Sequence, residues 1–493
     1  MSTTQPWLSP RKTWLINPRW PSIKKSSTKP PPPRTLAGSE AAARGQGVGG
    51  YEELTPWQTI MKFKMNCLIC TAMTISAATD GYQIGLIGNI IANAGFIAQF
   101  GTQHTDDGGV VLASSVLSVW ASLGSVGQII GMVTLPFITD RFGRKISMYW
   151  YWLLLTISVF GGTGVGCLQS TIPAYISEVA LVRVRGMFLM AYSFWWILGQ
   201  FFAPVALQVM VEKDPNDYLT PIYTQWSQIG LMLIIYILVP ESPAWLATKG
   251  KVEQAKKSLN TIHRGVNGFD VDHQYNLLLI NIEHEREIAA EQNREKWYAI
   301  FRGRDGLRTV ISCWTLMAQQ FIGLGIFFGY ATYFFQQAGL KDPFKIICIT
   351  SGINIFFSIV VIAVSDVIGR RWLANVGTTI CWGFIGEISS QRLRPYTAGF
   401  AAASTCVVGV VMGILIPYMV NAHEWNWGLK TSWLFAGLGA PFTLAMWFLI
   451  PETAGRSAAE LDELFERKIK PWLFHKTVTA TQCMVEVNKK ERE

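Results

Sequence analysis

The sequence predicts an all-α polytopic membrane protein, with two pseudo-symmetric helical bundles and about 10–12 spans. Half of its 493 residues are hydrophobic and only 15% are charged, whereas a soluble chain carries about a quarter charged residues. Apolar runs near or above the ~20 residues that cross a bilayer recur along the chain. Short polar motifs between these runs occur twice in the same order, which indicates an internal duplication.

The duplication is visible in three kinds of motif: a basic turn with a glycine, a glutamate followed by arginines, and a proline–glutamate pair. They are Asp140–Lys145, Glu178 and Pro240–Ser242 in the first half, and Asp366–Arg371, Glu387 and Pro451–Thr453 in the second. From Glu178 to Glu241 is 63 residues, and from Glu387 to Glu452 is 65. A parallel repeat of this kind in a membrane protein is typical of transporters.

The order of apolar and charged segments predicts five regions. Residues 1–58 are rich in Pro, Ser, Lys and Arg and are expected to form a disordered cytoplasmic tail. Residues 59–240 and 309–451 are expected to form the two transmembrane bundles. Residues 241–308, with eleven Lys or Arg, form a cytoplasmic linker with helices, and 452–493 form a cytoplasmic tail. Without a secretory signal peptide, the first transmembrane helix is expected to direct insertion.

Two segments are too short for the repeat. Between Lys145 and Glu178 lie 32 residues, although two crossings need roughly 40 plus a turn. Between Arg371 and Glu387 lie only 15. Because both short segments fall at the same point of the repeat, we expect that parts of helices have been lost. An unusual topology of the second half is the alternative.

Composition argues against several other classes. The net charge of +9 comes from basic residues beside apolar spans, so it predicts topology and not nucleic-acid binding. Seven of the eight cysteines lie in apolar stretches, and Cys67-x-x-Cys70 is interpreted as packing rather than a redox or metal site. Gly162-x-Gly164-x-Gly166 is expected to allow close helix packing. With scattered histidines and no catalytic motif, we expect no enzyme, no metal and no cofactor.

These motifs together resemble the sugar porter family of the major facilitator superfamily, most closely its fungal maltose and hexose transporters. The matching stretches are Asp140–Lys145, Tyr175–Glu178 with Arg185-Gly186, Pro240–Leu246, Gln319–Gly323, Asp366–Arg371, Gly386-Glu387 with Arg394-Pro395, and Pro451–Arg456. The resemblance covers about 60–455 and implies twelve helices in two halves around a central sugar site, worked by alternating access. It implies a plasma-membrane protein with both termini cytoplasmic, acting as a monomer on a neutral sugar, a hexose or an α-glucoside. Which sugar is transported stays open.

Neutral sugars are bound by amide side chains and by aromatic faces. Gln319 and Gln320 lie in a long apolar run, where an unpaired amide is costly, and they match the family's paired sugar-binding glutamines. A hydrogen bond between helices is the alternative role. The resemblance adds five substrate-binding positions, two of them aromatic: Tyr330, Asn354, Trp382, Ser193 and Thr405. Gly325 stands where the family usually has an asparagine.

Proton coupling is left open by the sequence. The family's proton symporters have an aspartate where this chain has Gln83, which cannot titrate. Asp80 lies three residues earlier, on roughly the same helix side, and is the other proton-coupling candidate. The arginine that partners that aspartate in the family would fall at Ser158. Proton symport and facilitated diffusion are therefore both retained.

Charged residues at the inner helix ends predict a cytoplasmic gate. Carboxylates and guanidinium groups there can form paired networks that hold the halves together, and breaking them lets the halves rock. The alternative is that these charges only set topology. The predicted gate residues are Asp140, Arg144, Glu178, Arg185 and Glu241 in the first half, and Asp366, Arg370, Glu387, Arg394 and Glu452 in the second.

Three rival functions keep the same fold. A sugar sensor would be expected to have a longer tail than the one of about 40 residues after Glu452. A transporter of an acidic or polyol substrate such as galacturonate or quinate is disfavoured, because no extra basic residue falls among the predicted site positions. An inactive truncated transporter is the third rival.

Overall fold

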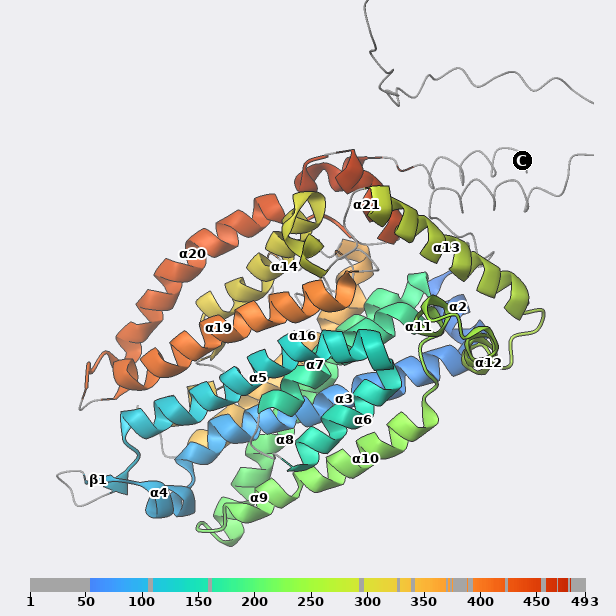
Figure 1. The fold of residues 1–493 in the computed structure, drawn as a ribbon. Coiled ribbons are helices and arrows are strands. Elements are labelled where there is room, and N and C mark those ends of the chain that lie inside the picture. The colour runs from blue at the N-terminus through green and yellow to red at the C-terminus, as the bar shows by residue number, and fades with distance from the viewer. Residues whose placement is uncertain are drawn as a thin grey trace, which may run out of the picture.

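The computed structural model describes residues 54–104, 110–157, 162–291, 297–325, 329–337, 342–368, 371–372, 375, 388, 393–421, 424–453, 458–467, 469–477 and 479. Within them, ten helices pack lengthwise into one bundle (Figure 1). The first half supplies α3 (Lys64–Asn89), α5 (Ser114–Phe142), α6 (Arg144–Ile157), α7 (Gly162–Val179), α8 (Val182–Lys213) and α10 (Gln225–Leu238). The second half supplies α14 (Gly303–Phe321), α16 (Pro343–Ile368), α19 (Arg394–Val420) and α20 (Thr431–Leu449).

Short elements cover the two ends of the bundle (Figure 1). One end, called the outer end here, carries η1 (Ile90–Ala92), α4 (Ala94–Phe100), β1 (Gln103–His104), β2 (Val110–Val111), α9 (Leu219–Tyr223), α15 (Ala331–Gln337) and η5 (Gly428–Lys430). The opposite, inner end carries α2 (Pro56–Lys62), α11 (Pro243–Thr248), α12 (Val252–Ile262), α13 (Val271–Glu291), η2 (Trp297–Phe301), α21 (Ala458–Glu466) and η6 (Pro471–Lys476). Strands β1 and β2 pair antiparallel, with Gln103 opposite Val111.

Six helical stretches in the described residues are long and apolar enough to cross a membrane. They are Ser114–Phe142, Arg183–Lys213, Leu219–Leu238, Pro343–Ile362, Tyr396–Val420 and Thr431–Leu449. A seventh is obtained if Lys64–Ala92 and Ala94–Phe100, bent by 71°, count as one span. Helix α6 has only 14 residues, about 21 Å at 1.5 Å per residue, against a bilayer core of about 30 Å. The described part of α6 is thus shorter than the bilayer core, and both the short segment and the loss of parts of helices stay predictions. In the second half, the short segment after Arg371 lies mostly outside the described residues.

The helices pack in an order that repeats between the halves. Helix α3 lies along α8 in the first half, and α14 lies along α19 in the second. The halves meet where α5 packs on α19 and α8 packs on α16. Between α5 and α7 the backbones approach closely, since a Cβ at Gly162 would lie 1.8 Å from the Gly124 carbonyl oxygen. This supports the packing role predicted for the glycine-rich stretch.

Candidate functional site

A cavity of about 210 Å³ lies between the two halves. Its wall is built by α3, η1, α5, α7 and α8 of the first half and by α14, the stretch after α14, and α19 of the second. The polar or aromatic lining residues are Trp120, Ser125, Gln128, Gln169, Trp196, Gln319, Gln320, Tyr330 and Thr405. None of the described lining residues carries a charge. Amides, hydroxyls and aromatic faces in an otherwise apolar wall suit a neutral ligand with many hydroxyl groups.

Four residues predicted from the sequence lie in this one cavity: Gln319, Gln320, Tyr330 and Thr405. The Tyr330 hydroxyl donates to the Gly413 carbonyl oxygen at 3.0 Å, which fixes the ring against α19. Gly325 also lines the cavity, at the position where the family usually has an asparagine. The structure therefore brings these residues together, and their contact with a ligand stays a prediction.

Three other predicted binding residues lie elsewhere. Asn354 is exposed on α16, and Ser193 is half-buried on α8, one turn before Trp196. Neither belongs to the cavity wall. Trp382 lies outside the described residues.

Sequence reasoning missed several polar and aromatic side chains of the first half: Trp120, Ser125, Gln128, Gln169 and Trp196. The Trp120 indole N–H donates to the Ile87 carbonyl oxygen at 3.3 Å, and Gln128 Oε1 accepts from the Cys406 thiol at 3.2 Å. An amide in an apolar run is costly unless it is hydrogen-bonded or functional. This holds for Gln128 and Gln169 as it does for Gln319 and Gln320.

Asp80, one of the two proton-coupling candidates, is 1% exposed on α3. Its Oδ2 accepts a hydrogen bond of 2.8 Å from Gln169 Nε2 on α7. Gln83 is also buried on α3, and neither Asp80 nor Gln83 lines the cavity. Ser158, where the family's arginine would fall, lies outside the described residues.

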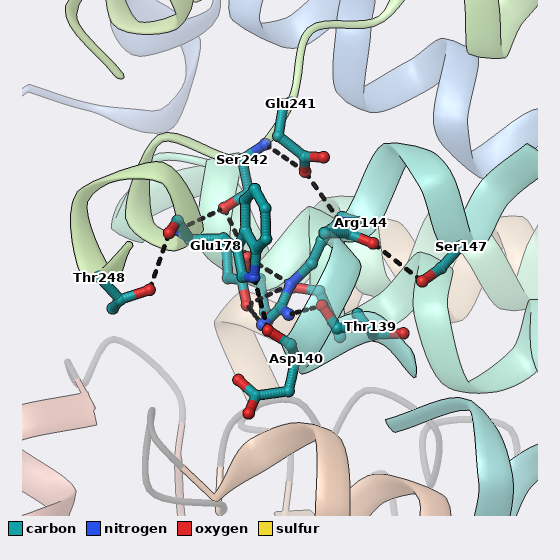
Figure 2. Close-up of polar contacts among 12 residues, drawn as sticks. Thr139, Asp140, Arg144, Ser147, Glu178, Glu241, Ser242 and Thr248 are labelled. Carbon is teal, nitrogen blue, oxygen red and sulfur yellow. Dashed lines mark hydrogen bonds and ion pairs between the residues drawn. The ribbon is translucent and has the colours of Figure 1, made fainter. Parts of the chain in front are cut away.

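The predicted gate of the first half is assembled around Arg144 (Figure 2). Arg144 Nη2 lies 2.7 Å from Glu178 Oε1, and Arg144 Nε lies 3.2 Å from both oxygens of the same carboxylate. Arg144 Nη1 donates to the Thr139 carbonyl oxygen at 3.1 Å. The pair is largely buried, with 9% and 13% of the two side chains exposed. Such a bidentate ion pair fixes the inner ends of α6 and α7 relative to each other.

Glu241 completes this network from the beginning of the linker (Figure 2). Its two oxygens accept from the backbone N–H groups of Arg144 at 2.9 Å and of Lys145 at 3.0 Å, so it caps the N-terminus of α6. The Ser242 hydroxyl donates to Glu178 Oε2 at 2.6 Å. A glycine is required at position 143, in the turn between α5 and α6. Gly143 has a φ of +106°, and a Cβ there would lie 2.5 Å from Glu241 Oε2.

The second half repeats the contact to the closing glutamate. The Arg371 backbone N–H donates to Glu452 Oε2 at 3.2 Å, as that of Lys145 does to Glu241. The Arg371 side chain donates to the Trp447 carbonyl oxygen near the end of α20, at 2.6 Å. Lys145 Nζ donates to the Ile237 carbonyl oxygen near the end of α10, at 2.9 Å. The two turns are therefore related by structure as well as by sequence.

The remaining predicted gate residues are less clearly part of a network. Asp140 is exposed, and its backbone carbonyl oxygen accepts from the Trp245 indole N–H at 2.9 Å. Arg185 is half-buried on α8, close enough to Cys70 to interact with it electrostatically. The side chains of Asp366, Arg370, Glu387 and Arg394 lie outside the described part of the chain.

Near the outer end, three hydrogen bonds join the two halves. Thr332 on α15 donates to the Asn89 amide oxygen on α3. Asn421 Nδ2, just after α19, donates to the Ser114 hydroxyl on α5 at 2.7 Å, and the Ser118 hydroxyl donates to the Ile414 carbonyl oxygen at 3.1 Å. These bonds, called the outer latch here, hold α5 and α3 against the second half.

Comparison with known proteins agrees with this geometry. The family model described as "Sugar (and other) transporter" matches residues 69–161, 149–384 and 372–465. The chain is 27% identical to the general alpha-glucoside permease of Saccharomyces cerevisiae, over 87% of this chain and 79% of the permease. It is 26% identical to the MFS transporter fmqE of Aspergillus fumigatus, over 87% of this chain and 92% of that protein.

A solved structure of the MFS (major facilitator superfamily) proton:xylose symporter XylE has a TM-score of 0.66 to this chain. The likeness covers 81% of this chain and 100% of XylE, at 21% sequence identity. The fold is therefore that of the major facilitator superfamily, as the sequence predicted.

Proposed function

The chain belongs to the sugar (and other) transporter family, and we propose that it moves a neutral sugar, a hexose or an α-glucoside, across a membrane by alternating access. The observation that carries this proposal is the cavity between the halves, whose described lining is uncharged and includes Gln319 and Gln320 from the second half and Gln128 and Gln169 from the first. Amide groups can both donate to and accept from sugar hydroxyls, and Trp120 and Trp196 supply aromatic faces for the C–H side. The cavity is the proposed sugar site.

Alternating access needs one closure at each end of the cavity. The outer latch supplies the outer closure, through Asn89, Ser114 and Ser118 of the first half. In our proposal the inner closure forms when the latch opens. The networks around Glu241 and Glu452 fix the positions of the inner helix ends, and these ends then meet. The moving bodies are the bundles of 59–240 and 309–451, joined by the linker of 241–308.

We place the protein in the plasma membrane as a monomer, with both termini in the cytoplasm. The inner end supports this orientation, because it carries the linker with its many basic residues. The inactive alternative is disfavoured by the packing of the short helices. Tyr151 of α6 and Tyr175 of α7 are both 0% exposed, so the shortened segment still forms a core.

The lining also discriminates between substrate classes. An acidic sugar or quinate carries a carboxylate, which would need a cationic partner in a site closed off from water. Among the described lining residues there is no Lys or Arg. The lining therefore favours a neutral sugar. It does not separate a transporter from a sensor, because both bind sugar in such a site.

The test is uptake of a panel of labelled sugars by a yeast strain that lacks its own sugar transporters. The full chain is expressed, and its amount at the cell surface is measured in the same cells. We expect uptake of at least one neutral sugar, abolished by Gln319→Ala at equal surface expression. A chain that reaches the surface and moves no sugar would contradict the proposal, and sugar binding without uptake would favour the sensor.

A further inference from the structure

Gln169 on α7 contacts both the cavity and a buried carboxyl group. Its side chain lines the cavity between the halves, and its Nε2 donates to Asp80 Oδ2 at 2.8 Å. Asp80 itself, 1% exposed on α3, lies behind the cavity wall. Gln169 therefore connects the cavity to this carboxyl group, as does Trp196, which also lines the cavity and hydrogen-bonds to Asp80.

Among the described residues, the side chains that interact with the Asp80 carboxyl group include hydrogen-bond partners and no cation. The hydrogen-bond partners are Gln169 on α7 and Tyr192 and Trp196 on α8, and the Cys406 thiol on α19 interacts with Asp80 electrostatically. Tyr192 and Cys406 are the titratable groups among them, and neither becomes a cation. An ionised carboxylate without a cationic partner is costly in a site closed off from water. Asp80 is thus a group that can take up a proton when the cavity closes.

The two forms of Asp80 require different ends of the Gln169 amide. An ionised carboxylate only accepts hydrogen bonds, so it holds the amide –NH₂ and leaves the carbonyl oxygen for the cavity. A protonated carboxyl group can donate its O–H to that carbonyl oxygen, which leaves the –NH₂ for the cavity. One rotation of the amide therefore changes what the cavity offers a sugar hydroxyl, from an acceptor to a donor.

We propose that Gln169 is the positioning residue that couples protonation of Asp80 to sugar binding, through this exchange of its amide ends. The proton comes from water on the side to which the cavity is open and returns to water on the other side, with no covalent step. This inference rests on the proposed sugar transport and selects proton-linked transport over simple facilitated diffusion. Gln169 thereby provides, with a neutral amide, a link between a carboxyl group and the sugar site.

The chain offers a matched control in Gln128. It lines the same cavity from α5, and its recorded partner is the Cys406 thiol and not Asp80. Loss of Gln128 should weaken sugar binding without changing how binding depends on pH. Loss of Gln169 should remove the pH dependence.

The experiment measures the KM for the transported sugar at about pH 5.5 and about pH 7.5, either side of neutrality. We compare the unmodified chain with Gln169→Leu, Asp80→Asn, the double variant and Gln128→Leu. In the unmodified chain KM should differ by about fivefold between the two pH values, as expected for one exchanged hydrogen bond. Gln169→Leu and Asp80→Asn should each give a KM independent of pH, and the double variant should add no further change. Gln128→Leu should raise KM at both pH values and leave the ratio of the two KM values unchanged.

The outcomes separate the two proposals. Uptake that does not depend on pH in the unmodified chain would overturn the coupling role and leave sugar transport standing. Retention of the full pH ratio in Gln169→Leu, or its loss in Gln128→Leu, would also overturn it. Absence of any uptake would contradict both proposals. If Gln169→Leu does not reach the surface, Gln169→Met replaces it. The same ratio is then also measured on purified protein, from tryptophan fluorescence during sugar titration, since Trp196 lies beside Asp80.

Discussion

The two inner turns of the molecule share a motif and a contact to the closing glutamate, while the counterparts of Arg144 and Glu178, which are Arg370 and Glu387, lie outside the described residues. In the first half, Arg144 pairs with Glu178 of α7 while Glu241 caps α6. In the second half, Arg371 contacts Glu452 and two backbone carbonyl oxygens, those of Trp447 and Trp472. The contact between the turn and the closing glutamate is therefore common to both halves.

The backbone contact of the inner turn and the buried ion pair beside it depend on different parts of the chain. The backbone contact to the closing glutamate forms in both halves, although 32 residues follow the turn before Glu178 and only 15 follow it before Glu387. It does not depend on the length of the segment that follows the turn. The buried ion pair, in contrast, needs a glutamate at the end of α7, so it depends on the helices behind the turn.

Arg144→Leu should have the largest effect. It leaves the Glu178 carboxylate largely buried without its cation, which costs about 3–5 kcal/mol. Lys145→Leu and Arg371→Leu, at the equivalent position of the two turns, remove side-chain bonds to backbone carbonyl oxygens and should lower stability less. Thermal unfolding of the purified variants in detergent compares them directly. Equal losses of Tm in Arg144→Leu and Lys145→Leu would contradict the larger contribution of the buried ion pair.

Glu241→Gln should have a smaller effect. One amide oxygen can replace only one of the two acceptors that hold the Arg144 and Lys145 N–H groups, and the charge at the N-terminus of α6 is lost. We expect a loss of about 1–2 kcal/mol. Glu452→Gln changes the equivalent glutamate of the second half, which accepts from the Arg371 N–H, and should lower stability by a similar amount. The free energy of unfolding of both variants provides the measurement, and a stability unchanged by Glu241→Gln would contradict its capping role.

Asn421→Ala tests the contribution of the outer latch, which we expect to be smaller than that of the inner turns. It removes one neutral hydrogen bond to Ser114, about 1 kcal/mol, so the population open at the outer end should rise about fivefold. The rate at which an impermeant maleimide added outside labels Cys406, which lines the cavity, reports that population. Thr134→Ala, which removes an exposed hydrogen bond to the Ile130 carbonyl oxygen within α5, serves as the control. An unchanged labelling rate in Asn421→Ala would exclude a latch role for this bond.

The smallest predicted effect concerns His263 in the linker. Its ring stacks on Phe269, with centroids 4.4 Å apart, and meets Phe63 edge-on at the start of α3. Burial lowers the pKa of His263 below its usual value. The unfolded chain therefore binds this proton more readily, and stability should fall as the pH drops below about 6.5. His263→Gln should reduce the difference in Tm between neutral and mildly acidic pH. An unreduced difference would show that other groups cause it.

Much of the fold was predictable because its signals are local. Apolar runs and paired motifs predicted two helical halves, and Arg144, Glu178 and Glu241 were predicted to meet because their types and order suited a charge network. The sequence did not predict which atoms form that contact. That Glu241 binds the backbone N–H groups of Arg144 and Lys145, 97 and 96 residues away, follows only from the folded positions of α6 and α11.

Only those cavity residues that match motifs of the family could be predicted from the sequence. Gln319, Gln320, Tyr330 and Thr405 were named from matching motifs and do share one cavity. Gln169 was not named, because a single glutamine in an apolar run looks like a packing residue until its neighbours are known. Its partner Asp80 lies 89 residues earlier, on another helix. No spacing in the sequence relates the two.

The most direct test of the central claim asks whether the transported sugar occupies the cavity. Cys406 lines the cavity, whereas Cys348 on α16 does not, so each molecule contains its own reference thiol. Purified protein is treated with N-ethylmaleimide, and the labelling of each thiol is followed by mass spectrometry of its peptide. We predict that the sugar taken up by cells slows labelling of Cys406 and not of Cys348, and that Gln319→Ala removes this protection. Equal labelling of Cys406 with and without a sugar that is taken up would place the sugar site elsewhere.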